Sequence, residues 1–430
     1  MELPQKPKHT TGPLPFLNPT TRYHPIPPHH PSSHPPPPPH TKTTTTTTTP
    51  PPPPPTSPKE TTKKQEEIYH IWRSRDNRKG RHALLTPHPS PTARATNTLS
   101  ETLRGLARMF TRFPIWDVSY DVAVVFTLGS VVWCINGFFV WYPLVAPQTE
   151  FPGEVDVGGG WTAFVGATVF EVGSVLLMLE AVNENRTDCF GWAVEEALED
   201  DKPRLHTTPD ACRHHHQDKR GWLRRNVFLA PGALAAAAAV PPLDDGVVGH
   251  DDLPKESSGR RRQWSWWPSW YELRTHYLRE IGFLACLAQM VGATIFWISG
   301  FTALPSINSS LSPGALDGVY WLPQVVGGSG FIVSSLLFML EVQDRWYLPA
   351  PKLLGWHVGF WNLIGALGFT LCGALGFALD AGGDAIEYAS TLSTFVGSWA
   401  FLIGSLFQWY ESLDKYPISV GNAPSFLSES

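Results

Sequence analysis

Four glutamates lie within or at the ends of long apolar stretches, where a carboxylate could act on a proton or a cation. Glu171 stands near the middle of the stretch Trp161–Val182, and Glu180, Glu341 and Glu411 each lie at the end of such a stretch. An ionised carboxylate inside a bilayer is costly, and acids in that position commonly mark ion or proton sites. These residues are therefore the first candidates for chemistry.

Two interpretations remain open for Glu171. In the first it is a proton- or cation-linked site. In the second it is a protonated or hydrogen-bonded acid, held by a nearby polar side chain. The candidate partners in this intramembrane polar site are Asn136, Gln289 and Asn362.

The other three acids occupy one register. A carboxylate at the C-terminal end of a helix opposes the helix macrodipole, so helix stability does not account for Glu180, Glu341 and Glu411. We expect a ring of interhelical ion pairs at the cytosolic rim, with a cation-selecting charged vestibule as the alternative. The expected partners are the basic residues that precede the other apolar stretches: Arg112, Arg274, Arg279 and Lys352.

The three stretches that end in these acids share the motif V-G-x-x-x-F-x-x-[GS]-S-x-x-x-x-x-E without gaps. Its small residues recur on one helix face. Small residues allow helix backbones to approach closely in a membrane, so helix packing is the default interpretation and a pathway lining is the alternative. The candidate packing residues are Gly166, Gly173, Ser174, Gly327, Ser335, Gly397, Gly404 and Ser405.

Six stretches are long and apolar enough to cross a bilayer, which needs about 20 residues of helix. Trp and Tyr stand repeatedly at their edges, as is typical of membrane interfaces. We therefore predict a polytopic membrane bundle with the bilayer as its first partner. The six predicted spans are Ser119–Tyr142, Trp161–Val182, Ile281–Leu304, Trp321–Val342, His357–Leu379 and Tyr388–Tyr410.

The odd-numbered spans share a second pattern, a Gly followed eight residues later by Gly-Phe, as at Gly129 and Gly137. Together the two motifs predict an all-α fold of three parallel copies of a two-helix hairpin. The expected organisation is a disordered tail (1–100), a first hairpin (101–186), a cytosolic loop (187–277), a second hairpin (278–345), a third hairpin (346–415) and a short cytosolic tail (416–430).

The tail over residues 1–100 is dominated by Pro, Thr, His and Lys, including the proline runs 35–39 and 50–55. Such a composition buries too little apolar surface to offset the entropy of ordering the chain, so disorder is expected. Its proline runs are candidate ligands for Pro-motif-binding proteins.

Lys and Arg are absent from three alternate connections between the spans and concentrated in the others. The positive-inside rule therefore predicts an integral membrane protein with both termini in the cytosol. Asn308, in an Asn-Ser-Ser sequon, falls on the external or lumenal side and is a glycosylation candidate.

The long loop adds one candidate partner. Trp264, Trp266, Trp267 and Trp270 follow Arg260–Arg262, which predicts an interfacial anchor near anionic lipid headgroups. Cysteines and histidines in this loop lack zinc spacing, so no metal or cofactor is expected. A net charge of −5 argues against a nucleic-acid partner.

The segments 354–365 and 395–405 resemble the YrhK-like membrane hairpin, and they are similar to a group of fungal integral membrane proteins built from several such hairpins. This resemblance implies a topology and no activity. No nucleophile–base pair, phosphate loop or H-E-x-x-H motif points to an enzyme. Two functions remain: transport of a small solute or ion, or a membrane scaffold or sensor that recruits cytosolic partners or lipids.

Overall fold

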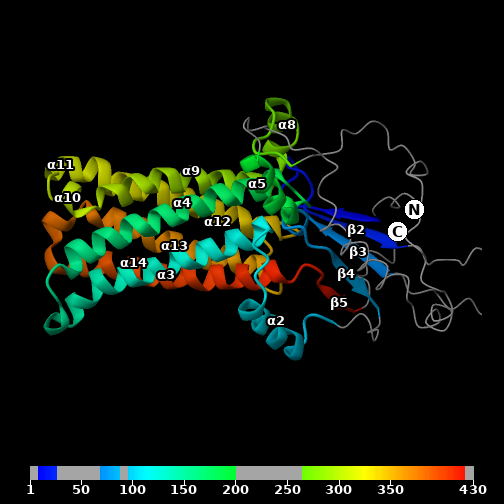
Figure 1. Ribbon diagram of the computed structural model, residues 1–430, viewed down its shortest axis with the longest axis horizontal. Helices are drawn as coiled ribbons and strands as arrows, with labels where there is room; N and C mark the ends of the chain where they lie inside the picture. The colour runs from blue at the N-terminus through cyan, green and yellow to red at the C-terminus, as the bar shows by residue number, and fades with distance from the viewer. Residues whose placement is uncertain (1–7, 27–67, 88–94, 200–263, 422–430) are drawn as a thin grey trace, which may run out of the picture.

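The computed structural model describes residues 8–26, 68–87, 95–199 and 264–421. Six long helices run side by side, and a small β-sheet lies beyond one end of them (Figure 1). We call this the sheet end of the bundle and the opposite one the far end.

The six predicted spans are confirmed as helices that are long and apolar enough to cross a membrane. Each observed span overlaps its predicted range, and several extend further at the far end, where short helical turns continue them. Four spans are single helices: Val118–Val145 (α3), Ile281–Thr302 (α9), Leu354–Gly376 (α13) and Ala381–Leu413, which lies within α14 (Leu379–Leu413). The span Glu154–Val182 consists of a π-helical turn (Glu154–Gly159) and α4 (Gly160–Val182). The span Pro313–Glu341 consists of α11 (Pro313–Leu316), a π-helical turn (Asp317–Trp321) and α12 (Leu322–Glu341).

The helices form a closed ring. Each packs on two of the others, in the order α3, α4, α9, α12, α13 and α14, and α14 returns to α3. Helices consecutive along the chain are therefore neighbours in space. At the far end, α14 is interrupted at Gly383, whose φ of 59° favours glycine.

The sheet joins segments from both parts of the chain. Its strands are β1 (His9–Thr11), β2 (Thr21–Ile26), β3 (Ile68–Arg73), β4 (Ala83–Thr86) and β5 (Ile418–Val420). The first four pair antiparallel in sequence order, and β5 pairs parallel with β4. The sheet therefore ties the chain after α14 to the segment that precedes α3.

This sheet corrects the all-α prediction and the expectation of disorder for residues 8–26 and 68–87. In β3, Tyr69 and Ile71 are buried and alternate with half-buried neighbours, the pattern of a strand with one covered face. The average composition of residues 1–100 concealed this local alternation. The proline runs at 35–39 and 50–55 lie outside the described residues.

In the described part of the chain, four short helices lie at the sheet end: α1 (Ser74–Arg78), α2 (Leu99–Thr111), α5 (Phe190–Glu199) and α8 (Trp270–Thr275). Of these, α1 connects β3 to β4 and places its basic side chains against the end of the helical ring. The position of α1 creates the candidate site.

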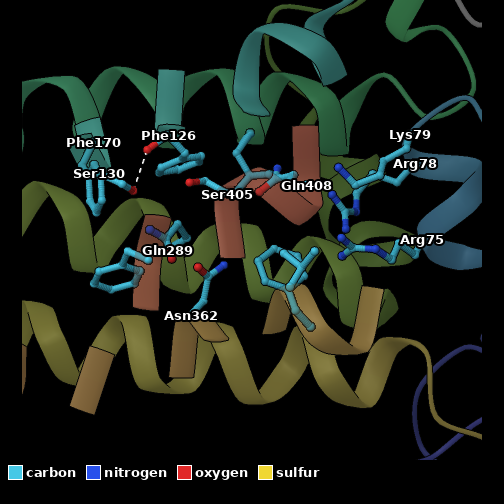
Figure 2. Close-up of a pocket in the computed structure, with 14 residues that line it drawn as sticks. Arg75, Arg78, Lys79, Phe126, Ser130, Phe170, Gln289, Asn362, Ser405 and Gln408 are labelled. Carbon is cyan, nitrogen blue, oxygen red and sulfur yellow. Dashed lines mark hydrogen bonds between the residues drawn. The ribbon is translucent and has the colours of Figure 1, made fainter. Parts of the chain in front are cut away.

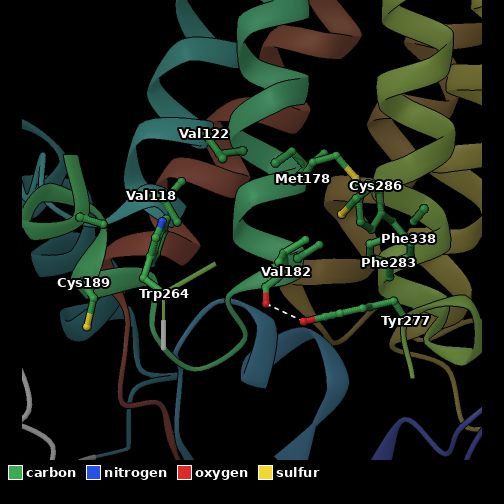
Figure 3. Close-up of a cluster of buried hydrophobic side chains, with 14 residues drawn as sticks. Val118, Val122, Met178, Val182, Cys189, Trp264, Tyr277, Phe283, Cys286 and Phe338 are labelled. Atoms are coloured by element: carbon green, nitrogen blue, oxygen red, sulfur yellow. Dashed lines mark hydrogen bonds between the residues drawn. The ribbon is translucent and has the colours of Figure 1, made fainter. Parts of the chain in front are cut away.

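A hydrophobic core closes one side of the sheet end (Figure 3). Trp264 lies inside it with an exposed fraction of 2 %, beside Phe190 and Cys189. The prediction that Trp264 anchors the chain in the membrane interface is therefore wrong, whereas Trp267 and Trp270 are exposed. Arg260–Arg262 and residues 200–263 as a whole lie outside the described residues.

The contact between α9 and α12 generates a stability prediction. A Cβ atom at Gly327 would lie 2.6 Å from the carbonyl oxygen of Gly292, so the two backbones would have to separate. We expect Gly327→Ala to lower the free energy of unfolding in detergent micelles by about 1–3 kcal/mol. The same substitution at Gly314, which has open space around it, is the control and should be neutral. Equal stability of the two variants would contradict this packing.

Candidate functional site

Three carboxylates from three helices converge on the axis of the ring at the sheet end. Glu180 of α4, Glu341 of α12 and Glu411 of α14 are each 0–1 % exposed. The segment of α1 and the residues that follow it bring four cations to the same place. We call these seven residues the charge cluster: Arg75, Arg78, Lys79, Arg81, Glu180, Glu341 and Glu411.

The guanidinium groups of two arginines bind the three acids. Arg75 donates to both carboxylate oxygens of Glu411, from Nε at 3.0 Å and from Nη2 at 2.7 Å. Arg78 donates to Glu341 from Nη2 at 2.9 Å and also pairs with Glu180. These bidentate and bridging contacts are the strong form of charged hydrogen bond. One short helix thereby connects three spans.

Small residues near the start of α3, α9 and α13 make room for these side chains. A Cβ atom at Gly282 would lie 2.1 Å from Oε1 of Glu341, and one at Gly355 would lie 2.5 Å from the Arg75 side chain. The corresponding residue of α3 is Ser119, which is fully buried. Each of these is the second residue of its helix, so the cluster depends on the same position in three helices.

Asp76 balances the charge of the cluster. The four cations face three glutamates and also this aspartate, whose Oδ1 accepts a hydrogen bond from Arg81 at 2.7 Å. Burial lowers the pKa of Lys79, and Arg75 and Arg78 act in the same direction, against the effect of Glu180 and Glu411. The ammonium group of Lys79 has no hydrogen-bond partner among the described residues; it lies 3.6 Å from Glu180 and 3.9 Å from Glu411. Lys79 is thus the weakest-held cation of the cluster.

The partners expected from the sequence are wrong. Arg112, Arg274, Arg279 and Lys352 are exposed, and the three acids are buried on the axis of the ring, not placed along its rim. The physical reason is that α1 enters from the end of the bundle and delivers guanidinium groups directly onto the axis. The expected partners lie at exposed positions instead, and the ion pairs of the three glutamates are with α1 and the residues that follow it.

A small cavity lies directly inside the charge cluster (Figure 2). Its volume is about 30 Å³, enough for one or two water molecules. The amides of Gln289, Asn362 and Gln408 and the hydroxyls of Ser130 and Ser405 line it, between aromatic rings and the cations of α1. We call it the inner cavity.

Aromatic side chains close the inner cavity on the side of the far end. The rings of Phe170 and Phe401 are 5.5 Å apart, and Phe401 also contacts Phe331 at 6.3 Å and Phe369 at 5.3 Å. We call this layer the aromatic septum. Its members are Trp133, Phe170, Phe296, Phe331, Phe369 and Phe401. The ring pairs that involve Trp133 or Phe401 meet edge to face, so these side chains pack closely against one another.

A larger hollow opens beyond the septum at the far end. Its volume is about 680 Å³, and its floor includes Trp133 and Phe296. Asp156 and Glu387 line it, and among the described residues that line it there is no Lys or Arg. We call it the far vestibule. Its lining therefore favours a cation or a neutral polar solute over an anion.

The far vestibule also contains two residues singled out in the sequence. Asn136 donates from its amide to the carbonyl oxygen of Gly159 at 2.7 Å. Asn308 donates to the carbonyl oxygen of Thr302 at 3.3 Å and is half-buried. Glycosylation of Asn308 stays a prediction, and it would require this amide to turn outward.

Glu171 lies apart from both hollows. Thr294 of α9 donates to its Oε1 at 2.9 Å, and its Oε2 has no hydrogen-bond partner among the described residues. The polar partners expected for Glu171 are therefore wrong. Asn136 faces the far vestibule, and Gln289 and Asn362 face the inner cavity. Glu171 therefore tethers α4 to α9 and does not join the predicted polar site.

The small residues of the shared motif lie where helices touch. Three of these glycines pack against aromatic residues of a neighbouring helix: Gly166 against Trp133, Gly327 against Phe296 and Gly397 against Phe369. A Cβ atom added to any of the three glycines would lie only 2.7–3.0 Å from that aromatic residue. Gly173 and Gly404 face Phe126 and Asn362 in the same way. These contacts are those of helix packing; Ser174 and Ser335 are buried beside them. Ser405 differs, because it also lines the inner cavity.

Sequence reasoning missed the four cations of the charge cluster. The signal was a run of five basic residues in nine, from Arg73 to Arg81, between two short apolar segments. Three acids at the same position of a shared motif also indicated that three partners of opposite charge must lie nearby. No group of residues suited to a metal ion occurs among the described residues.

The charge cluster generates a second prediction. Glu341→Met leaves Arg78 buried without its bidentate partner, and we expect the free energy of unfolding to fall by about 3–5 kcal/mol. Arg78→Met together with Glu341→Met keeps the net charge of the cluster, so the double variant should lose much less than the sum of the two single variants. Unfolding in mixed detergent micelles measures each value.

A matched exposed pair serves as the control. Arg104 and Glu101 form an ion pair on the surface of α2. Replacing either should change stability by no more than about 1 kcal/mol, because exposed pairs are solvated in both states. Additive losses for Arg78 and Glu341 would contradict the pairing in the charge cluster.

Comparison with known proteins adds no family: no family model, no curated protein and no solved structure matches this chain.

Proposed function

We propose that this chain is a multi-pass membrane protein whose helical ring encloses a pathway for a small cation or polar solute. The observation that carries the proposal is the inner cavity, which lies on the ring axis between the septum and the charge cluster. Amide and hydroxyl groups at the centre of a membrane bundle are expected where they face water or a solute. In this conformation the pathway is closed.

Two barriers account for the closed state. The aromatic septum separates the inner cavity from the far vestibule, and the charge cluster separates it from the sheet end. Aromatic and apolar constrictions exclude water and ions when they are narrow. Movement of the septum would connect the two hollows, and movement of α1 would open the inner cavity to the other side.

The threefold arrangement supports this proposal. The phenylalanines of the shared motif, Phe170, Phe331 and Phe401, meet in the septum, and the glutamates of the same motif meet in the charge cluster. We infer that the ring consists of three copies of one hairpin around a central axis. Parallel repeats around an axis along the membrane normal occur in transporters. The resemblance to YrhK-like hairpins stays a prediction.

The orientation follows from charge. The sheet end carries the basic residues of α1, α2 and the segments before the spans, so the positive-inside rule favours the cytosol for this end. Strands β1 and β5 belong to one sheet, which is consistent with both terminal regions on the same side.

A scaffold that transports nothing is the second candidate, and the sealed septum favours it. A bundle with six aromatic rings packed at its centre is also what a purely structural core requires. The two candidates differ in whether the inner cavity can be reached from water.

Cysteine accessibility distinguishes the two candidates. In a background without reactive cysteines, Thr391→Cys in the far vestibule should react with a charged thiol reagent added to the far side. Gln289→Cys in the inner cavity should react slowly, and its rate should rise several-fold when Arg78→Met with Glu341→Met weakens the charge cluster. An unreactive Gln289→Cys in both backgrounds would favour the scaffold.

Ion flux tests the septum. In proteoliposomes, Phe401→Ala removes a ring from the centre of the septum and should raise the leak of potassium at least several-fold over the unsubstituted protein. Phe377→Ala, at an exposed position near the far end, is the matched control and should leave the leak unchanged. Because loss of a buried ring also destabilises the fold, Phe401→Leu provides a milder comparison. Equal leak in all these proteins would contradict a central pathway.

A further inference from the structure

One face of α2 exposes a continuous apolar row. Leu99, Leu103, Leu106 and Phe110 follow the spacing i, i+4, i+7 and i+11, which places them on one side of the helix. Their exposed fractions are 77, 58, 44 and 76 %. An apolar row of this size on a well-formed helix indicates a contact surface.

The orientation of α2 is set by α14. Gly105 lies so close to Tyr410 that an added Cβ atom would be 2.4 Å from its ring, and Met109 is buried in a cluster with Tyr120 and Leu413. These contacts use an adjoining face of the helix and leave the apolar row free. Thr98 caps the N-terminus by accepting from the backbone amide of Glu101.

The chain immediately after α2 leads into the membrane. Only six residues separate its end from α3, and Phe113, Ile115 and Trp116 among them are exposed. Exposed aromatic residues also precede α9 and α13 at the same end of the bundle. They are Trp267, Trp270, Tyr271, Trp346 and Tyr347. Aromatic belts of this kind mark the boundary between bilayer and water.

We propose that α2 lies in the plane of the membrane surface at the sheet end and inserts its apolar row between the lipid acyl chains. The occupant of this face is the bilayer, because the row is continuous with the lipid-facing aromatic belt of the spans. Arg104 and Arg112, both exposed, would contact anionic headgroups. This inference is independent of a central pathway.

Depth measurements on the full chain in lipid nanodiscs test the proposal. A spin label at Leu103→Cys, in a background without reactive cysteines, should show several-fold greater exposure to oxygen than to a water-soluble nickel complex. A label at Arg104→Cys is the control and should show the reverse preference, because Arg104 is exposed and lies on the side of the helix away from the apolar row. Both positions are exposed, so neither label should disturb folding.

Two outcomes would overturn the inference. If the label at Leu103 is as accessible to nickel as the label at Arg104, the apolar row faces water or a protein partner and not the bilayer. For the headgroup contact, phosphatidylserine in the nanodisc should increase the depth of the Leu103 label. Arg104→Gln with Arg112→Gln should abolish that increase while the label remains in the bilayer. The contact with anionic headgroups would be contradicted if phosphatidylserine did not change the depth of the Leu103 label. It would also be contradicted if the change persisted in the doubly substituted protein.

Discussion

Neutralising three buried carboxylates is the constraint on which this structure depends. Glu180, Glu341 and Glu411 each end a helix on the axis of the ring, where an unpaired charge would cost several kcal/mol. The only described groups close enough to neutralise them belong to α1 and the residues just after it. The helix must therefore be held at this point, and β3 and β4 hold it from both sides. Strand β5 then ties the chain after α14 to the same sheet.

The same interaction also determines what the centre of the bundle can do. The guanidinium group of Arg78 lies 5.1 Å from the ring of Phe338, so it covers apolar surface as well as pairing with acids. Beyond it the inner cavity, the septum and the far vestibule follow one another along the ring. A movement of the charge cluster would therefore first alter the surroundings of the polar groups in the inner cavity, which are the groups suited to a solute.

Much of the fold was predictable because hydropathy reports the bilayer directly. The six spans, the motif and the importance of its three glutamates could be predicted from apolar length and register. The partners of those glutamates could not, because Arg75 and Arg78 are separated from Glu411 and Glu341 by more than 260 residues. Ion pairing across such a distance depends on the strands that position α1, and those strands lie within a stretch whose average composition indicates disorder.

Glu171 and Trp264 show the limits of reading residues one at a time. A lone acid in a span suggested a polar site, but a hydroxyl on the neighbouring helix, that of Thr294, is its partner. A tryptophan next to a basic run suggested an interfacial anchor, but Trp264 packs into the core beside Phe190. In both cases the deciding information is which helix face meets which neighbour, and periodicity alone does not supply it.

Disulfide capture tests most directly whether α1 closes the end of the ring. Asn77 donates from its side chain to Glu184 at 2.8 Å, and its carbonyl oxygen accepts from the amide of Asn185 at 2.7 Å, so the two segments are in contact. With Asn77→Cys and Glu184→Cys in native membranes, a disulfide should form readily and its yield should fall when Glu341→Met weakens the charge cluster. Absence of the disulfide, or a yield that does not respond to Glu341, would contradict the account.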